Sequence, residues 1–293
     1  MISIKGLIIK SDRGIYFVKL TNGDEYQCKA RGLFRKEDKK PLVGDYVDIR
    51  ISDEDGSGYI EELYPRVSEL LRPPVANINQ VIILMSIREP DINLRLLDKY
   101  LLMTEKADIK TIIVFNKTDL IEQEEKDYYQ SIYEDIGYDL YFNSNVEGTK
   151  LHLKELLEDK TTAITGPSGV GKSTTLSYLF PDKSFPIGEI SQKLRRGKNT
   201  TRHTEIKDIG FGYILDTPGF SSLSLDFIDN KEEIPYLMKD FQSFISKCRF
   251  KNCMHLNEPD CGVKKAVESN EIAESRYKNY VSFVEEYEEK RRY

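Results

Sequence analysis

Gly166-Pro-Ser-Gly-Val-Gly-Lys-Ser173 decides the fold of this 293-residue chain, because it has the form G-x-x-x-x-G-K-S. The apolar run Thr162-Ala-Ile-Thr165 before it predicts a buried strand, and residues 174–180 after it predict a helix. Glycines let successive backbone N–H groups point at one anion, and a helix N-terminus adds partial positive charge. We therefore expect a P-loop that holds the phosphates of a nucleotide.

Two residues of this P-loop have specific expected roles. Lys172 can reach the β- and γ-phosphates, and the hydroxyl of Ser173 can ligate Mg²⁺. The other nucleotide contacts expected here come from Gly166, Pro167, Ser168, Gly169, Val170, Gly171 and Thr174.

A second motif, Asp216-Thr-Pro-Gly219, ends the apolar run at residues 212–215. A carboxylate at the end of a strand beside the P-loop can hold Mg²⁺ through water, so Asp216 is expected near the metal. The N–H of Gly219 can then contact a γ-phosphate. The two motifs together predict a site for the phosphate end of a nucleotide.

A third motif, Asn116-Lys-Thr-Asp119, ends another apolar strand and predicts which base is bound. The carboxylate of Asp119 can accept two hydrogen bonds, from guanine N1–H and N2–H₂, a donor pair that adenine lacks. Asn116 can meet other base or loop groups, and the stem of Lys117 can lie over the ring. The three motifs together favour GTP.

The order of the motifs predicts a circularly permuted domain. In ordinary GTP-binding domains Asn-Lys-x-Asp follows the P-loop, whereas here it precedes it. Ser144-Asn145 lies between the two, where a small-residue loop could support the base. Permutation is tolerated because domain termini lie at the surface and are often close together. Strands that alternate with helices from residue 80 indicate an α/β fold with a mainly parallel sheet.

Three domains are expected along the chain. Residues 1–68 contain five short strands separated by turn signals, which is typical of a small OB-like β-barrel. Residues 69–225 form the circularly permuted GTPase domain, and residues 226–293 form a helical zinc-binding domain. The barrel strands are expected at residues 4–10, 15–20, 25–30, 45–51 and 59–64, followed by a linker at residues 65–74.

Cys248-x4-Cys253-x-His255-x5-Cys261 offers three thiolates and one imidazole, the ligand set of a closed structural zinc site. The alternative is a group of buried free cysteines beside a surface histidine. Clustered Cys and His in an intracellular chain favour a metal over a disulfide. Helices are predicted at residues 264–269 and 274–292. Helices this few bury little apolar surface, so we expect them to need the metal ion in order to fold.

Composition limits the partners. The net charge of −6 at pH 7 excludes a global attraction to nucleic acid, so a phosphate-rich partner must meet local basic patches. Basic residues gather in the loops at residues 31–40 and 193–203. Each loop is either an RNA contact or an ordinary solvated loop. The chain shows no signal-peptide pattern and no apolar run that could span a bilayer, which predicts a cytoplasmic protein without a membrane partner.

A barrel, a permuted GTP-binding domain and a Cys/His zinc module, in this order, resemble the small-subunit-dependent, circularly permuted bacterial GTPases that act in late 30S subunit assembly. The resemblance covers essentially the whole chain and includes all four motifs quoted above. It implies GTP hydrolysis stimulated by the small ribosomal subunit, and contacts of the barrel and the zinc module with 16S rRNA. We also expect a monomer that binds GTP and GDP with Mg²⁺, and one structural zinc ion per chain.

The residue that orients the attacking water departs from known patterns. Phe220 stands where many GTPases place a glutamine, and Asn199 stands where the resembled family has a candidate histidine. His203 is the nearest histidine and becomes the candidate catalytic residue; alternatively, it only packs or hydrogen-bonds within its loop. Thr200 or Thr201 could complete the Mg²⁺ shell, and Thr201 is the preferred ligand.

Two other functions remain open from the sequence. A non-catalytic RNA-binding scaffold would use its nucleotide only to fix its shape, but the intact Lys172, Ser173 and Asp216 argue against it. An ATP-using P-loop enzyme is disfavoured by Asp119. A turnover assay tests the first alternative, and nucleotide competition tests the second.

Overall fold

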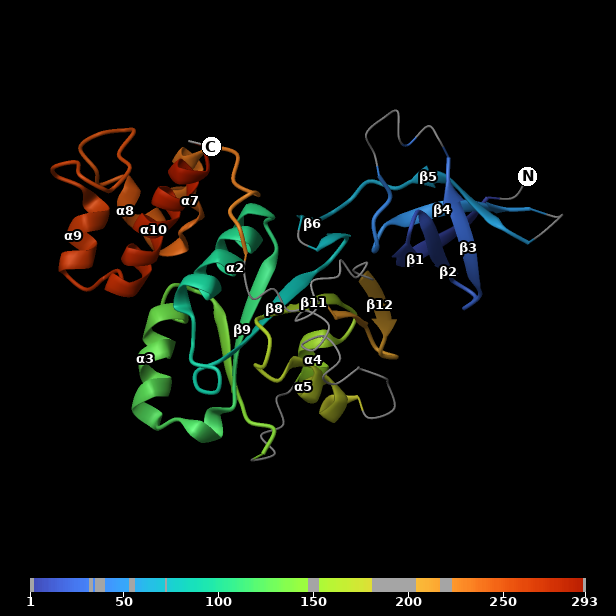
Figure 1. Cartoon of the computed structure of the whole chain (residues 1–293), viewed down its shortest axis with the longest axis horizontal. Coiled ribbons are helices and arrows are strands. Elements are labelled where there is room, and N and C mark those ends of the chain that lie inside the picture. The colour runs from blue at the N-terminus through green and yellow to red at the C-terminus, as the bar shows by residue number, and fades with distance from the viewer. Residues whose placement is uncertain are drawn as a thin grey trace.

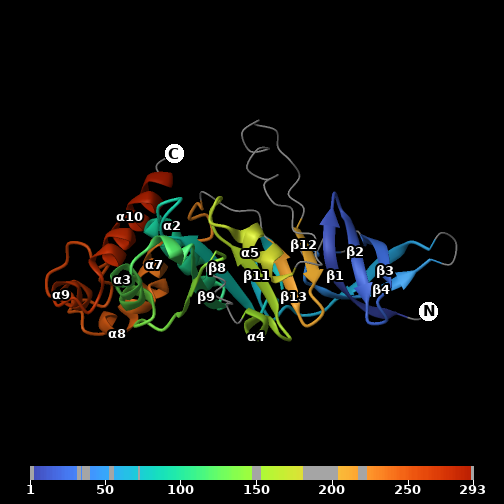
Figure 2. The ribbon, with the colours of Figure 1, turned by 90° about the horizontal axis from the view of Figure 1, so that it is seen from below.

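A five-stranded barrel, a central sheet covered by helices and a group of C-terminal helices follow one another along the molecule (Figures 1 and 2). The computed structural model describes residues 3–31, 34, 40–52, 56–71, 73–146, 153–180, 204–216 and 223–291. Among these residues, no helix is both long and apolar enough to cross a membrane. Several predicted features lie outside the described residues, namely most of the loop at 31–40, the loop at 193–203, Asn199, Thr200, Thr201, His203, Gly219 and Phe220.

The N-terminal barrel consists of β1 (Ile4–Asp12), β2 (Ile15–Leu20), β3 (Glu25–Ala30), β4 (Tyr46–Ile51) and β5 (Gly58–Leu63). β1 pairs with both β2 and β4, which closes the barrel, and β3 pairs in parallel with β5. Alternate side chains point inward. The barrel core is fully buried and includes Ile8, Val18, Cys28, Val47, Ile49 and Ile60. The barrel expected from the sequence is thus confirmed.

The segment expected as a linker contains regular structure. β6 (Glu69–Leu71) pairs antiparallel with β7 (Pro74–Ala76). Arg66 donates to both carboxylate oxygens of Asp45, at 2.8 Å each, and Asp45 is completely buried at the edge of the barrel. A bidentate pair of this kind fixes direction as well as distance. The connection is therefore held against the barrel.

The central sheet has the strand order β10-β9-β8-β11-β13-β12. Its strands are β8 (Gln80–Ser86), β9 (Lys110–Asn116), β10 (Asp139–Asn143), β11 (Thr161–Thr165), β12 (Thr204–Asp208) and β13 (Tyr213–Asp216). Neighbouring strands are parallel except β12, which runs antiparallel to β13. Every residue of β8 is buried, as expected for a parallel strand covered on both faces.

Helices cover both faces of this sheet. α2 (Leu94–Lys106) and α3 (Gln123–Tyr133) pack on one face, against side chains such as Ile83 and Phe115. α4 (Leu153–Leu157) and α5 (Lys172–Leu179) pack on the other face, against side chains such as Ile82 and Val114. The α/β architecture predicted from the alternation of strands and helices is confirmed.

The barrel and the central sheet share hydrogen bonds. β1 pairs antiparallel with β12, with Lys10 opposite Glu205 and Ser11 opposite Thr204 (Figure 2). The Nζ of Lys19 in β2 also lies 2.8 Å from a carboxylate oxygen of Asp208. Eleven of the strands in the described residues therefore form one continuous hydrogen-bonded network.

The C-terminal part packs against α2 (Figure 1). It consists of η2 (Lys231–Glu233), α7 (Ile234–Leu237), η3 (Lys239–Phe241), α8 (Gln242–Ile245), α9 (Gly262–Glu268) and α10 (Glu274–Lys290). Arg276 of α10 is completely enclosed and bonds Asp98 of α2 at 2.6 Å and Asp240 of η3 at 2.7 Å. Asn279 donates to the second oxygen of Asp98 at 2.6 Å. This buried polar cluster fixes the helices to the face of the sheet.

Candidate nucleotide and metal sites

The P-loop joins the end of β11 to the start of α5. Gly166 has a φ of +143°, and a Cβ built on it would lie 2.0 Å from the backbone oxygen of Leu84 in β8. A side chain at this position is sterically excluded, because real Cβ atoms do not approach an oxygen so closely. The loop can therefore pack directly on the neighbouring strand β8.

Lys172 lies at the first turn of α5 and folds back over the P-loop. Its Nζ donates to the backbone oxygens of Gly166 at 2.8 Å and of Pro167 at 2.7 Å. A phosphate oxygen is a stronger, charge-assisted partner for an ammonium group than a carbonyl is. A nucleotide phosphate can therefore replace these two carbonyl contacts of Lys172. The next two residues of α5 are accessible to solvent, since Ser173 is partly exposed and Thr174 is exposed.

The segment at residues 116–119, called the base loop here, is bonded to the P-loop. Asn116 ends β9 and lies opposite Ser86 of β8. Its side chain is 1% exposed, and its Nδ2 donates to the backbone oxygen of Val170 at 2.8 Å. A Cβ on Gly171, which has a φ of +94°, would lie 2.5 Å from the same Nδ2. The two predicted motifs are thus in direct contact.

Ser144 orients the carboxylate of Asp119. The Ser144 hydroxyl is buried and donates to Oδ1 of Asp119 at 2.6 Å. The backbone N–H of Val146 donates to the same hydroxyl oxygen at 3.2 Å, which fixes its position. Lys117 has a φ of +60°, and its Nζ donates to the backbone oxygen of Glu89. The base loop and the serine predicted to support it therefore lie together.

Sequence reasoning missed two residues of this network, Asn143 and Thr175. Asn143 ends β10, is 3% exposed, and donates from Nδ2 to Oδ1 of Asn116 at 2.6 Å. Asn145 in turn donates to the hydroxyl of Thr175 in α5 at 3.1 Å. A chain of amides thus connects the base loop, the segment after β10 and the P-loop helix. The sequence signal that could have identified Asn143 is an asparagine at the end of an apolar strand.

Asp216 ends β13, which runs parallel to β11. The strand register sets Asp216 opposite Ile164, two residues before the P-loop begins. Its backbone therefore reaches the same edge of the sheet as the P-loop and the base loop. Carboxyl ends of parallel strands form the ligand site in open α/β sheets.

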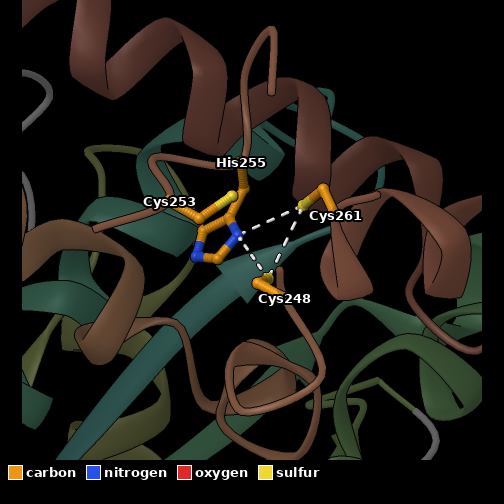
Figure 3. Close-up of side chains that lie close together, drawn as sticks. All are labelled: Cys248, Cys253, His255 and Cys261. Atoms are coloured by element: carbon orange, nitrogen blue, oxygen red, sulfur yellow. Dashed lines mark hydrogen bonds between the residues drawn. The ribbon is translucent and has the colours of Figure 1, made fainter. Parts of the chain in front are cut away.

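The four predicted metal ligands come together in the C-terminal part (Figure 3). One ligand atom from each of Cys248, Cys253, His255 and Cys261 lies within 4.8 Å of the other three. The Nδ1 of His255 is 3.5 Å from the sulfur of Cys248 and 3.3 Å from that of Cys261, and those sulfurs are 3.9 Å apart. Two sulfurs bound at about 2.3 Å to a tetrahedral zinc would be about 3.8 Å apart. The spacing fits such an ion.

Electrostatics at this cluster also fit a cation. Burial raises the pKa of the Cys253 thiol to about 12 and raises the pKa of Cys261, so thiolates there need a positive charge nearby. Burial lowers the pKa of His255, which keeps its imidazole in the neutral, metal-binding form. The N–H of Gly262 donates to the sulfur of Cys248 at 3.2 Å. A metal ion could therefore be held here.

Neighbouring groups fix the segment that carries His255. Glu258 accepts hydrogen bonds from the backbone N–H of Met254 at 2.8 Å and of Leu256 at 2.9 Å. The hydroxyl of Tyr277 in α10 donates to the backbone oxygen of His255 at 2.7 Å. Such supporting contacts orient metal ligands. They also join the cluster to the helix that packs on α2.

Comparison with known proteins relates the whole chain to one group. A family model described as RsgA N-terminal domain matches residues 5–60, and one described as RsgA GTPase matches residues 63–226. "Small ribosomal subunit biogenesis GTPase RsgA" of Alkaliphilus metalliredigens is 44% identical over 292 residues, which cover 99% of each chain. The protein of the same name from Clostridium botulinum is 45% identical over 285 residues, or 97% of each chain.

Two solved structures are similar over nearly the full length. YloQ, described as a circularly permuted GTPase, has a TM-score of 0.79 and 36% identity, with 99% of this chain and 96% of that chain covered. YjeQ from Thermotoga maritima has a TM-score of 0.82 and 35% identity, with 97% and 98% covered.

Proposed function

The chain belongs to the RsgA GTPase family, and we propose that it couples GTP hydrolysis to late assembly of the small ribosomal subunit. Membership makes it a GTP-hydrolysing enzyme with a circularly permuted GTPase fold. Its relatives are named for small ribosomal subunit biogenesis, and both relatives cited above match it over at least 97% of their length. We further propose that it acts late in assembly, that the small subunit stimulates its hydrolysis of GTP, and that it contacts 16S rRNA.

The hydrogen bond between Asn116 and Val170 is the observation that carries the assignment of the nucleotide site. It joins a loop suited to guanine to a loop suited to phosphates. The guanine loop precedes the phosphate loop in this sequence, which is the reverse of the order in ordinary GTP-binding domains. We assign guanine recognition to Asp119, supported by Ser144. The remaining proposed GTP contacts are Asn116, Lys117, Asn145, Gly166, Pro167, Ser168, Gly169, Val170, Gly171, Lys172, Ser173, Thr174, Thr201, Asp216 and Gly219.

Hydrolysis of GTP in this enzyme class uses Mg²⁺ bound to the phosphates. We assign Ser173 and Thr201 as its protein ligands, with Asp216 acting through water. His203 is our candidate for orienting the attacking water. Because no glutamine follows Asp216-Thr-Pro-Gly219, turnover by the isolated protein should be slow until a partner completes the site.

We assign a structural zinc ion to Cys248, Cys253, His255 and Cys261, within a domain at residues 226–293. The spacing of the sulfurs and the imidazole supports zinc, since three thiolates and one imidazole are a preferred zinc set. The domains at residues 1–68 and 69–225 complete the proposed division of the chain.

Contacts with 16S rRNA are proposed for both ends of the molecule. On the barrel, Arg50 lies over the ring of Tyr59, with its guanidinium carbon 5.2 Å from the centroid. Beside the metal cluster, Arg249 lies 5.6 Å from the centroid of the Phe250 ring, which is 45% exposed. Cations and aromatic rings that reach solvent can bind phosphates and stack on bases. Arg249 and Phe250 are exposed, whereas Arg50 and Tyr59 are half-buried and Arg50 also bonds Glu61 at 3.2 Å. We propose that the protein works as a cytoplasmic monomer.

The test of this function is GTP turnover by the purified protein with and without purified small subunits. We expect slow turnover alone and a strong increase with small subunits, and a Lys172→Ala variant should remove both activities. Excess GDP should compete with GTP, whereas excess ATP should not. Turnover that the small subunit leaves unchanged would contradict the proposed role, and competition by ATP would contradict the guanine site.

A further inference from the structure

The chain between β8 and α2 adjoins both parts of the proposed nucleotide site. Residues 87–92, called the β8–α2 loop here, leave the same edge of the sheet as the base loop and the P-loop, because β8 runs parallel to β9 and β11. Lys117 of the base loop donates from Nζ to the backbone oxygen of Glu89. On the P-loop, a Cβ built on Gly169 would lie 3.6 Å from Cδ of Pro90. The β8–α2 loop therefore lies against both motifs.

Side-chain bonds on both sides of Glu89 fix the β8–α2 loop. The hydroxyl of Ser86, at the end of β8, is buried and donates to the backbone oxygen of Pro90 at 2.9 Å. The guanidinium of Arg88 lies 2.7 Å from a carboxylate oxygen of Glu125 in α3. The residues before and after Glu89 are thus each held by a partner outside the loop. The carbonyl of Glu89 is consequently presented to Lys117 from a fixed position.

Glu89 contributes its backbone rather than its side chain. Its φ is +50°, in the left-handed region that glycine enters freely and that residues branched at Cβ avoid. Its side chain is exposed and has no hydrogen bond or ion pair with any other described residue. What distinguishes this position is therefore the direction of its carbonyl.

The bond to Glu89 restrains the whole side chain of Lys117. Lys117 has a φ of +60° at the turn between β9 and η1 (Thr118–Leu120), two residues before Asp119. With Nζ held at the β8–α2 loop, the four methylene groups of the side chain span from the base loop to that loop. A long side chain that is already restrained loses less rotamer freedom when a ligand packs on it. The stem of Lys117 is thus ordered before a base arrives.

We propose that Glu89 is a positioning residue for base recognition, whose backbone oxygen holds the Lys117 ammonium so that the Lys117 stem is preorganised over the place assigned to the guanine ring. The proposal rests on the assignment of residues 116–119 to guanine. A contact with the ring is the same in GDP, in GTP and in the transition state. It therefore strengthens the binding of every guanine nucleotide equally and leaves kcat unchanged.

The test compares Glu89→Val with Glu89→Gly, which both remove the same exposed carboxylate. Glycine keeps the carbonyl in place, whereas valine disfavours the positive φ and moves it. For Glu89→Val we expect affinities for GDP and for a non-hydrolysable GTP analogue to fall about tenfold, as when a hydrogen bond to a charged group is lost. KM for GTP should rise by a similar factor, with kcat within about twofold. Glu89→Gly, the conservative variant, should retain the parent affinities.

A second pair of variants asks whether the effect passes through Lys117. Lys117→Met keeps an apolar stem but has no donor for the carbonyl of Glu89. In this background Glu89→Val and Glu89→Gly should bind GDP equally, because residues that act through one contact are not additive. Equal GDP affinities of the two Glu89 variants in the parent background would overturn the proposal. So would a tenfold difference that persists beside Lys117→Met, or a fall in kcat that matches the fall in affinity.

Hydrogen exchange covers the case in which Glu89→Val does not fold. The amides of residues 88–92 are followed in the nucleotide-free parent protein and in Lys117→Met. We expect faster exchange of this loop in Lys117→Met, because its anchor on the base loop is lost, and unchanged exchange in β9. Equal exchange of the loop in the two proteins would overturn the proposal. A parent protein that keeps the slow exchange but binds no guanine nucleotide would instead refute the proposed function.

Discussion

Guanine selectivity is expected to depend on a single carboxylate. Ser144 donates to Oδ1 of Asp119, which sets the plane of the carboxylate that we propose to face the base. We predict that Asp119→Asn weakens GTP binding at least tenfold and improves binding of xanthosine triphosphate, because the amide matches the altered edge of xanthine. Asp127→Asn, at an exposed position in α3, is the control. Competitive titration with both nucleotides is the measurement, and an unchanged GTP affinity would remove Asp119 from the site.

The amide of Asn143 should matter for both stability and binding. Its loss leaves the buried Oδ1 of Asn116 without the donor at 2.6 Å, and an unsatisfied buried acceptor costs about 1–3 kcal/mol. We predict that Asn143→Ala lowers the free energy of unfolding by about that amount and weakens GDP binding, because Asn116 is no longer fixed against the P-loop. Urea unfolding and nucleotide titration measure the two effects. The exposed Gln130→Ala is the control, and equal stability of the two variants would contradict the network.

At the scale of elements, the attachment of α10 to α2 is expected to depend on Arg276. The guanidinium neutralises two buried carboxylates, Asp98 and Asp240, and breaking a buried pair costs about 3–5 kcal/mol. We predict a loss of that order in the free energy of unfolding for Arg276→Met. Lys278→Met removes an exposed ion pair with Glu274 on the same helix and should have little effect. Similar unfolding curves for the two variants would show that the buried cluster does not hold the helix.

Metal removal should loosen the C-terminal helices selectively. We predict one zinc ion per chain by elemental analysis, and loss of order in α9 and α10 when a chelator removes it, since the raised thiol pKa values show how poorly this site stabilises thiolates alone. Hydrogen exchange should rise in residues 248–290 and stay low in β8. A protein purified without zinc, or full zinc occupancy in Cys253→Ala, would contradict the assignment.

Sequence patterns predicted elements well where a periodic run of residues is local. The five barrel strands and α10 lie close to their expected ranges, because buried and exposed residues alternate along each of them with the period of its own secondary structure. The β6–β7 hairpin was missed because each of its strands has only three residues. β12 was missed because it is short and pairs with β1, which is distant in the chain. The same limit applies to Asn143, Lys99 and Arg276, whose bonds to Asn116, Leu223 and Asp98 span 27, 124 and 178 residues of sequence.

At the scale of the whole molecule, hydrogen bonds join the three parts to one another. The barrel reaches the sheet through β1 and β12, and β12 begins directly after the basic loop at residues 193–203. The Nζ of Lys99 in α2 donates to the backbone oxygen of Leu223 at 2.9 Å and to Glu286 of α10 at 2.7 Å, and so joins α10 to the described chain that begins at Leu223. The order of the domains was predictable from motifs, but these junctions were not, because strand pairing and buried ion pairs between domains leave no local pattern.

The central claim is that GTP binding and small-subunit binding are coupled, and co-sedimentation with purified small subunits tests it most directly. The protein is loaded with GDP or with a non-hydrolysable GTP analogue, at one matched salt concentration, because contacts with RNA phosphates weaken steeply with salt. We predict markedly more protein in the pellet with the analogue than with GDP, as linkage requires if the subunit favours the GTP state. Equal amounts of protein in the pellet with the two nucleotides would contradict the coupling.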